Sequence, residues 1–263
     1  MEATLAALPP FRCVEHDADL AYDKDAFTCA RCANGLKVRS PLLMPAEEKG
    51  SARDEQVKFA YRIYSIVYPI AALFACWFVW KGSVRHQIRF FRDRIREAGR
   101  RGFLLDVGTG DGSLTKLALG KVEERPTILG VDLSEAMLRK AAKRLSGYKQ
   151  KVLYAADIGT AALRKGAFPA ITCFGTVHVF SDPLGTLRRL RELLSDDGEF
   201  SGSYLLRPGT PRRDRFVDWA KKVGLLATSY TEAEFDDLVA QAGMKYSRKE
   251  RNGQMILFTL VKA

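Results

Sequence analysis

One stretch of this chain is the most informative about its fold: Leu104-Leu105-Asp106-Val107-Gly108-Thr109-Gly110-Asp111-Gly112. An apolar run of strand length leads into a turn with three glycines, and residues 113–119 continue in a helical pattern. Glycine suits such a turn because the chain reverses sharply and its backbone must approach a ligand with no side chain between them. The stretch therefore predicts a strand, a ligand-binding turn and a helix, with a tight turn that binds nothing as the alternative.

Short apolar runs alternate with helical segments from here to residue 206, which is the pattern of β-α-β units and a parallel sheet. The predicted strands are 103–107, 128–132, 152–155, 170–175 and 199–205, and the predicted helices are 113–119, 134–145 and 184–194. A turn is expected at 195–199. After a basic, proline-containing insertion, Thr231 and Glu234 have the spacing of a capping box, so a helix should run to Ala242 and stop at Gly243. Two strand-like runs finish the chain.

Two further carboxylates follow the next two predicted strands. Asp132 ends the apolar run 128–132, and Asp157 closes the strand after it. Ligands of an open parallel sheet bind outside the carboxyl ends of its strands, so these two acids and Asp106 are expected to converge on one site. A carboxylate in the position of Asp132 can accept both hydroxyls of a ribose.

This arrangement resembles the class I S-adenosylmethionine-dependent methyltransferases over residues 100–263, and is most similar to the branch with the ubiquinone and menaquinone C-methyltransferases. Its glycine-rich turn fits the first motif of that family better than the dinucleotide pattern, since no further glycine follows Gly112 at the required spacing. The Asp-Pro pair at 182–183 also matches the family, whereas the turn at 195–199 replaces its usual Lys-Pro-Gly-Gly. The resemblance implies a Rossmann-like α/β fold with S-adenosylmethionine as cofactor.

The resemblance also assigns roles to residues. Asp106 and the Gly108–Gly110 backbone would hold the methionine moiety, Asp132 the ribose, and Asp157 with Ile158 the adenine. The cofactor-binding residues that it implies are Asp106, Gly108, Thr109, Gly110, Asp132, Leu133, Asp157, Ile158 and Phe174.

His178 is the single histidine of this predicted core. In several relatives a histidine here faces the methyl acceptor and takes a proton or orients a nucleophile, so His178 is the candidate catalytic residue. The alternative is a structural histidine bonded to backbone. Methyl transfer from a sulfonium needs mainly proximity and in-line alignment, so the reaction does not require a base.

A second motif lies near the N-terminus. Cys13-x2-His16 and Cys29-x2-Cys32 form two knuckles separated by twelve residues, which is the ligand pattern of tetrahedral zinc. The segment resembles the small zinc ribbons fused to, or partnered with, some methyltransferases, including ribosomal RNA guanine methyltransferases. About 45 residues have too little core to be stable alone, which favours a structural metal. Free thiols in a small β-hairpin are the alternative.

The segment between these two motifs changes from apolar to basic. Ile63–Trp80 holds no charged residue, and Pro69 interrupts it. A helical lid over the acceptor is expected here, with contact to a membrane surface or a true membrane span as alternatives. Eight basic residues then fall within Lys81–Arg101, where Arg85, Arg89, Arg92 and Arg96 have helical spacing. A second basic cluster consists of Arg207, Arg212, Arg213 and Arg215. Each cluster is either a solvated surface or a binding surface for an anion such as phosphate, lipid or RNA.

These observations predict three parts: a zinc-ribbon-like segment at 1–45, a helical lid at 46–101 and the S-adenosylmethionine-binding domain at 102–263. The predicted function is methyl transfer to a small, apolar or lipid-like acceptor. An RNA base methyltransferase and a non-catalytic scaffold are the alternatives. No secretory signal pattern is visible and the five cysteines suggest a reduced set, so a cytoplasmic protein is expected, with a location peripheral to a membrane as an option. The net charge of +11 fits anionic partners.

Overall fold

A computed structural model of the chain describes residues 11–13, 15–23, 26–32, 35–40, 42–45, 81–120, 122–222 and 226–263. The expected lid at Ile63–Trp80 lies outside the described residues. Within them, no helix is long and apolar enough to cross a bilayer.

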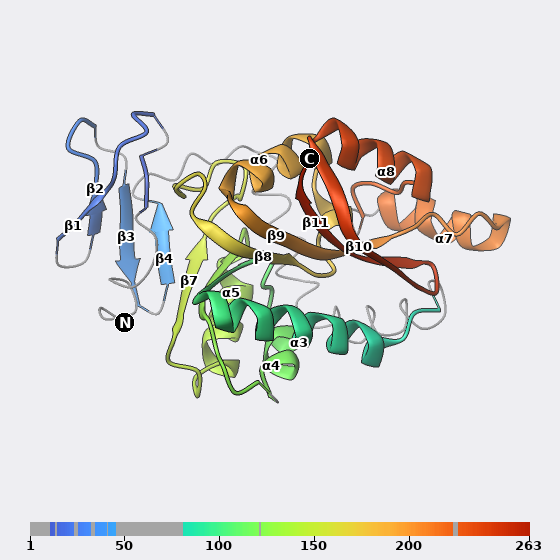
Figure 1. The fold of residues 1–263 in the computed structure, drawn as a ribbon, viewed down its shortest axis with the longest axis horizontal. Coiled ribbons are helices and arrows are strands. Elements are labelled where there is room, and N and C mark those ends of the chain that lie inside the picture. Colours follow the sequence, from blue (N-terminus) through green and yellow to red (C-terminus); the bar gives the residue numbers. More distant parts are fainter. Residues whose placement is uncertain are drawn as a thin grey trace.

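One mixed β-sheet runs through the molecule (Figure 1). The strands of its N-terminal lobe are β1 (Ala21–Asp23), β2 (Ala26–Thr28), β3 (Gly35–Arg39) and β4 (Leu42–Pro45). The strands of the main domain are β5 (Phe103–Val107), β6 (Thr127–Asp132), β7 (Lys151–Ala155), β8 (Phe168–Cys173), β9 (Leu194–Leu205), β10 (Met244–Asn252) and β11 (Met255–Lys262). Their order across the sheet is β1-β2-β3-β4-β7-β6-β5-β8-β9-β11-β10.

The central strands β7, β6, β5, β8 and β9 are parallel, and β11 is antiparallel to β9 and to β10. This confirms the Rossmann-like α/β fold. From β5 the chain adds β6 and β7 on one side of β5, and then crosses over to add β8 and β9 on the other side. The glycine-rich turn after β5 therefore lies where the strand order reverses. Open α/β sheets bind their ligands at such a point.

The helices of the main domain are α3 (Val84–Arg101), α4 (Ser113–Leu119), α5 (Glu135–Arg144), α6 (Pro183–Leu193), α7 (Pro211–Lys222) and α8 (Glu232–Gln241), with a 3₁₀ turn η1 at Val177–Val179. Helices α3, α4 and α5 cover one face of the sheet, and α6 and α8 cover the other (Figure 1). Burial on both faces explains the continuously apolar strands. On β5, for example, Leu104 packs with α3, and Leu105 packs in the core on the opposite face.

Several predicted elements agree closely with the structure. The helix after residue 230 begins with the expected capping box, in which Thr231 Oγ1 accepts from Glu234 N and the Glu234 side chain accepts from Thr231 N. Gly243 follows its end with a φ of 70°. The expected strand at 199–205 is longer, because β9 begins at Leu194 and the predicted turn forms an irregularity inside it, where its pairing with β8 shifts register. The basic insertion after residue 206 contains helix α7, which the sequence analysis did not predict.

The N-terminal lobe is joined to the main domain through the sheet. Leu42 and Leu43 of β4 pair in parallel with Leu153 and Tyr154 of β7. Seven residues of the lobe are buried in the same core cluster as strands β5 to β9, namely Phe11, Cys13, Leu20, Phe27, Cys29, Leu36 and Leu43. The lobe therefore does not rely on a core of its own.

Candidate functional site

The glycine-rich turn lies at the carboxyl end of β5 and opens helix α4. Gly108, Gly110 and Gly112 have φ values of 69°, 57° and 73°, which side chains other than glycine rarely adopt. A Cβ on Gly108 would collide with the side chain of Thr176, so the turn after β8 closes on this glycine. Among the described residues, a Cβ on Gly110 would meet only the Gly108 carbonyl oxygen, at 3.9 Å, so these residues leave the space beside Gly110 open.

Asp132 connects this turn to the end of β6. Its Oδ2 accepts a hydrogen bond from Gly110 N and its Oδ1 accepts one from Ser134 N, both at 2.8 Å. Burial raises the pKa of Asp132, while these two backbone N–H groups oppose the shift. Each carboxylate oxygen keeps a second lone pair, so the group can still accept the two hydroxyls of a ribose. Ser134 was missed by the sequence analysis, although its position as N-cap of α5 gives it a recognisable signature.

Asp106 has a different environment from Asp132. Its side chain is buried, and its two oxygens accept hydrogen bonds from the hydroxyls of Thr115 at 2.8 Å and Thr172 at 2.9 Å. Thr109 donates to its main-chain carbonyl at 2.8 Å. Burial raises the pKa of Asp106 to about 6, against the effect of these hydroxyls. The carboxyl of Asp106 therefore stabilises the start of the glycine-rich turn through its hydrogen bonds with Thr115 and Thr172.

The remaining predicted cofactor residues differ in exposure. Asp157 is exposed at the end of the β7 segment and accepts from Gly159 N at 2.8 Å, while Ile158 next to it is buried. Leu133 is half-buried beside Asp132. The ring of Phe174 is stacked on Phe91 of α3 at 4.5 Å and is buried, so its side chain serves the core.

His178 lies in η1, after the carboxyl end of β8. Its side chain is 6% exposed, and within the described residues its Nδ1 is buried with no hydrogen-bond partner. Burial lowers its pKa to about 4, so the ring is neutral at neutral pH. Its main-chain carbonyl accepts from Ala227 N at 3.0 Å and Thr228 N at 3.1 Å. The buried Oγ of Ser229, the next residue along, has no partner in the described part of the chain either.

The four predicted metal ligands come together in the N-terminal lobe. Cys13 Sγ lies 3.6 Å from His16 Nδ1 and 3.6 Å from Cys32 Sγ, and Cys29 Sγ lies 3.7 Å from His16 Nδ1. All four ligand atoms are within 4.8 Å of one another. Tetrahedral zinc, with bonds of about 2.3 Å to sulfur and about 2.0 Å to nitrogen, requires edges of roughly 3.6–3.8 Å. The cluster therefore has the size and donor set that zinc needs.

The environment of the Cys29 sulfur also favours metal binding. Arg31 N donates to it at 3.4 Å and lowers the pKa of the thiol to about 6. A lower thiol pKa favours the thiolate, which is the form that binds zinc.

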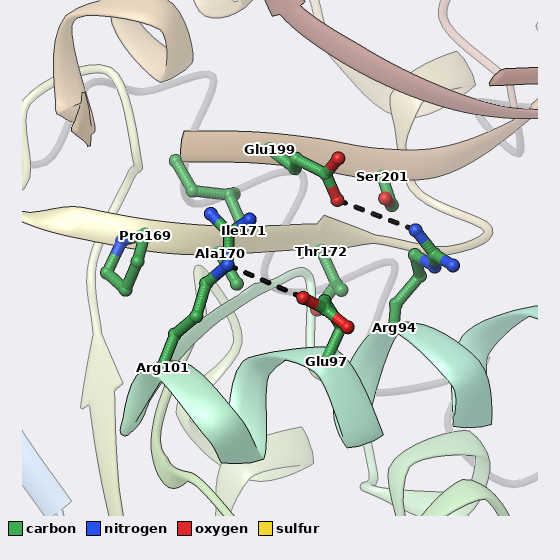
Figure 2. A pocket seen from close by; sticks show the side chains of 9 residues that line it. All are labelled: Arg94, Glu97, Arg101, Pro169, Ala170, Ile171, Thr172, Glu199 and Ser201. Carbon is green, nitrogen blue, oxygen red and sulfur yellow. Dashed lines mark hydrogen bonds and ion pairs between the residues drawn. The ribbon is translucent and has the colours of Figure 1, made fainter. Parts of the chain in front are cut away.

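Two of the four arginines predicted to form a basic face on α3 bind groups of the protein itself. Arg92 donates to the carbonyls of Leu117 and Ala118 and so closes the C-terminal end of α4. Arg96 pairs with Asp93 on its own helix. A small pocket between α3, β8 and β9 is likewise spanned by ion pairs from Arg94 to Glu199 and from Arg101 to Glu97, as Figure 2 shows. Its position beside the middle of β8, away from the glycine-rich turn, separates it from the candidate site.

Comparison with known proteins fits this geometry. Residues 105–200 match the family model described as a methyltransferase domain. This part of the chain is similar to that methyltransferase domain, and it contains the glycine-rich turn and Asp132. The fold of the main domain is shared with solved methyltransferase structures. The curated proteins contain no match to this sequence.

Solved methyltransferase structures share the fold at low sequence identity. Geranyl diphosphate C-methyltransferase from Streptomyces coelicolor A3(2), solved with Mg²⁺, geranyl diphosphate and S-adenosyl-L-homocysteine, has a TM-score of 0.58 at 15% identity, covering 68% of this chain and 77% of that one. YcgJ from Bacillus subtilis has a TM-score of 0.57 at 18% identity, with 68% and 98% covered. A chain from the complex of the Haloferax volcanii Trm112 methyltransferase activator with a methyltransferase has 0.53 at 14%, with 67% and 93% covered.

Proposed function

We propose that this methyltransferase binds S-adenosylmethionine at the carboxyl ends of β5, β6 and β7 and transfers its methyl group to a small, apolar or lipid-like acceptor. The observation that carries the proposal is the bond between Gly110 N and Asp132, which holds an open glycine turn against a ribose-binding carboxylate. When bound, the cofactor supplies a sulfonium-activated methyl group.

Each part of the cofactor has a candidate partner in this chain. Asp132 would hold the ribose hydroxyls, and the backbone of Gly108–Gly110 would lie against the methionine moiety. The main-chain segment at Asp157–Ile158 would meet the adenine. Asp106 would act through the turn that it braces, since both of its carboxyl oxygens already accept hydroxyls.

His178 is the proposed acceptor-side residue. A buried imidazole nitrogen without a hydrogen-bond partner lowers the stability of the folded protein, and at catalytic sites such a group can be satisfied by a ligand. Because the ring is neutral, Nδ1 can interact with the methyl acceptor in two ways, according to its tautomer. It can receive a proton or a hydrogen bond from the methyl acceptor, or it can donate a hydrogen bond to it. The uncharged run Ile63–Trp80 supports an apolar acceptor, although it lies outside the described residues. The geranyl diphosphate enzyme is one example of this fold acting on an isoprenoid.

We also propose that Cys13, His16, Cys29 and Cys32 bind one structural zinc ion. The ligand spacing within the cluster supports this, and so does the burial of Cys13 and Cys29. Elemental analysis of protein purified without added metal tests it, with one zinc per chain expected. A folded, active, metal-free protein would return these residues to a simple thiol cluster.

Calorimetry with S-adenosylmethionine tests the cofactor site. Asp132→Ala is expected to weaken binding by about 1.5–3 kcal/mol, or about 10- to 150-fold, as for hydrogen bonds to a charged group. Asp132→Asn keeps one acceptor oxygen and should lose less. Glu135→Ala, an exposed carboxylate at the start of α5, is the matched control and should bind as the parent does. Absence of binding by the parent protein would overturn the proposed function.

A further inference from the structure

Helix α7, which the sequence analysis missed, has two unlike faces. Val217 and Ala220 are buried and pack with Leu226 and the half-buried Leu205. The residues at positions i, i+3, i+7 and i+10 share the opposite face, and all four are exposed: Arg212, Arg215, Trp219 and Lys222. In Figure 1 the helix projects from the end of the molecule opposite to β1–β4.

The charges on this face are not neutralised by the acids of the same helix. Asp214 and Asp218 both lie toward Arg207, with N–O distances of 3.8 and 3.5 Å. Three cations therefore surround an indole that is 52% exposed. The ring of Phe216 lies 5.6 Å from that of Trp219 and is half-buried against the Val217, Ala220 and Leu226 cluster.

We propose that this face of α7 docks on an anionic phospholipid bilayer. Lysine and arginine are attracted to anionic headgroups, while tryptophan prefers the boundary between headgroups and acyl chains. A helix lying in that boundary needs cations flanking an aromatic group on one side, and α7 has this composition. The net charge of +11 draws the whole protein toward the same surface.

A bilayer fits this surface better than a nucleic acid does. Single-stranded nucleic acids bind in positively charged grooves, where successive bases stack on several aromatic side chains. The exposed face of α7 presents one indole, that of Trp219, on a helix that projects from the molecule.

The segments on either side of α7 connect this docking surface to the candidate site. On one side, Arg207 N donates to the carbonyl of Tyr230 at 3.0 Å, just beyond the carboxyl end of β9. On the other, Ala227 and Thr228 bond to the carbonyl of His178. Docking would thus hold the acceptor side of the sheet near the bilayer, so that a lipid-like acceptor enters from it. This purpose rests on the proposed function, whereas docking itself does not.

Vesicle co-sedimentation of the full chain, without cofactor or acceptor, tests docking. Binding is expected to vesicles that contain phosphatidylserine, to weaken with salt, and to be at least tenfold weaker on pure phosphatidylcholine. The double variant Arg212→Glu/Arg215→Glu should lose at least tenfold. The control Lys116→Glu/Lys143→Glu changes the net charge equally on exposed positions of α4 and α5, and should lose much less. Equal losses in both pairs would reduce the effect to net charge and overturn the proposal.

Tryptophan fluorescence tests the contact itself. The emission should shift to the blue on anionic vesicles, and Trp219→Phe should reduce the shift while keeping most of the binding; Trp77 and Trp80 account for any shift that remains. Trp219→Ala should weaken binding several-fold. A shift that Trp219→Phe leaves unchanged, or tight binding of RNA that the α7 variants abolish while vesicle binding is absent, would overturn the proposal. Cofactor affinity should be unchanged in all α7 variants, so failure of docking leaves the cofactor test above unaffected.

Discussion

The carboxyl group of Asp106 is enclosed by hydroxyls beneath the glycine-rich turn, where water cannot solvate its charge. Burial holds its pKa near 6, above the ordinary value of 3.8. Between about pH 4 and 6 the folded protein therefore binds more protons than the unfolded chain, and the free energy of unfolding should fall as pH rises through this window. The contribution is on the order of 3 kcal/mol.

Asp106→Asn should remove this part of the pH dependence. Urea unfolding of both proteins from pH 4 to pH 8 measures it, and the difference in unfolding free energy between them should change across the window and level off above it. A difference that is constant with pH would show that Asp106 titrates normally.

His178 should titrate in the opposite sense. Its pKa is lowered by burial to about 4 from 6.5, so the unfolded chain binds the proton more readily and stability should rise with pH between these values. NMR of the histidine rings should show His178 neutral down to nearly pH 4. His178→Gln should flatten the rise in stability. Protonation of His178 near pH 6.5 would mean that its ring is solvated.

The N-terminal lobe touches the segment proposed to meet adenine. Phe11 forms a bridge with Leu163, and Arg12 N donates to the Ala162 carbonyl at 3.2 Å, directly before the proposed metal ligand Cys13. The Phe11 ring also packs against Tyr154. From the other side, Arg189 of α6 bonds the carbonyls of Ala161 and Leu163. A metal ion bound at Cys13 would therefore stabilise one of the two anchors of the segment after β7.

Removal of the metal should consequently weaken cofactor binding. We expect S-adenosylmethionine affinity to fall about fivefold or more on chelation, which is the low end of usual coupling energies, and to return when zinc is restored. Calorimetry on stripped and reloaded protein measures it, and circular dichroism checks that the stripped protein is folded. A folded, stripped protein with unchanged affinity would separate the lobe from the cofactor site.

The continuous sheet makes the lobe and the main domain one cooperative unit. Leu43 of β4 is 1% exposed and lies in the same core as β5 to β9. Leu43→Ala should therefore cost about 2–5 kcal/mol in the stability of the whole chain. Leu117→Ala, at a leucine that is 55% exposed, is the matched control and should have little effect.

Two probes can follow this transition. Zinc release to a coloured chelator and loss of far-ultraviolet circular dichroism should occur at one midpoint, and Leu43→Ala should lower both together. Two separate midpoints would instead mean that the lobe unfolds as a domain of its own.

Most strands and helices of the main domain, and the residues proposed for both sites, were predictable from local sequence patterns. Strand length, glycine at positions of positive φ and the knuckle spacing are local properties, and local physics decides them. The capping box at Thr231 was found for the same reason.

Which side chains already have hydrogen-bond or packing partners could not be read from local patterns. That Asp106 is bonded by Thr115 and Thr172, that Phe174 stacks in the core and that Arg92 closes α4 depend on residues brought together from distant parts of the chain. The parallel pairing of β4 with β7 joins residues more than a hundred positions apart. Helix α7 has a weak apolar pattern because a narrow stripe alone is buried, and its exposed indole became evident only once packing fixed which side faces solvent.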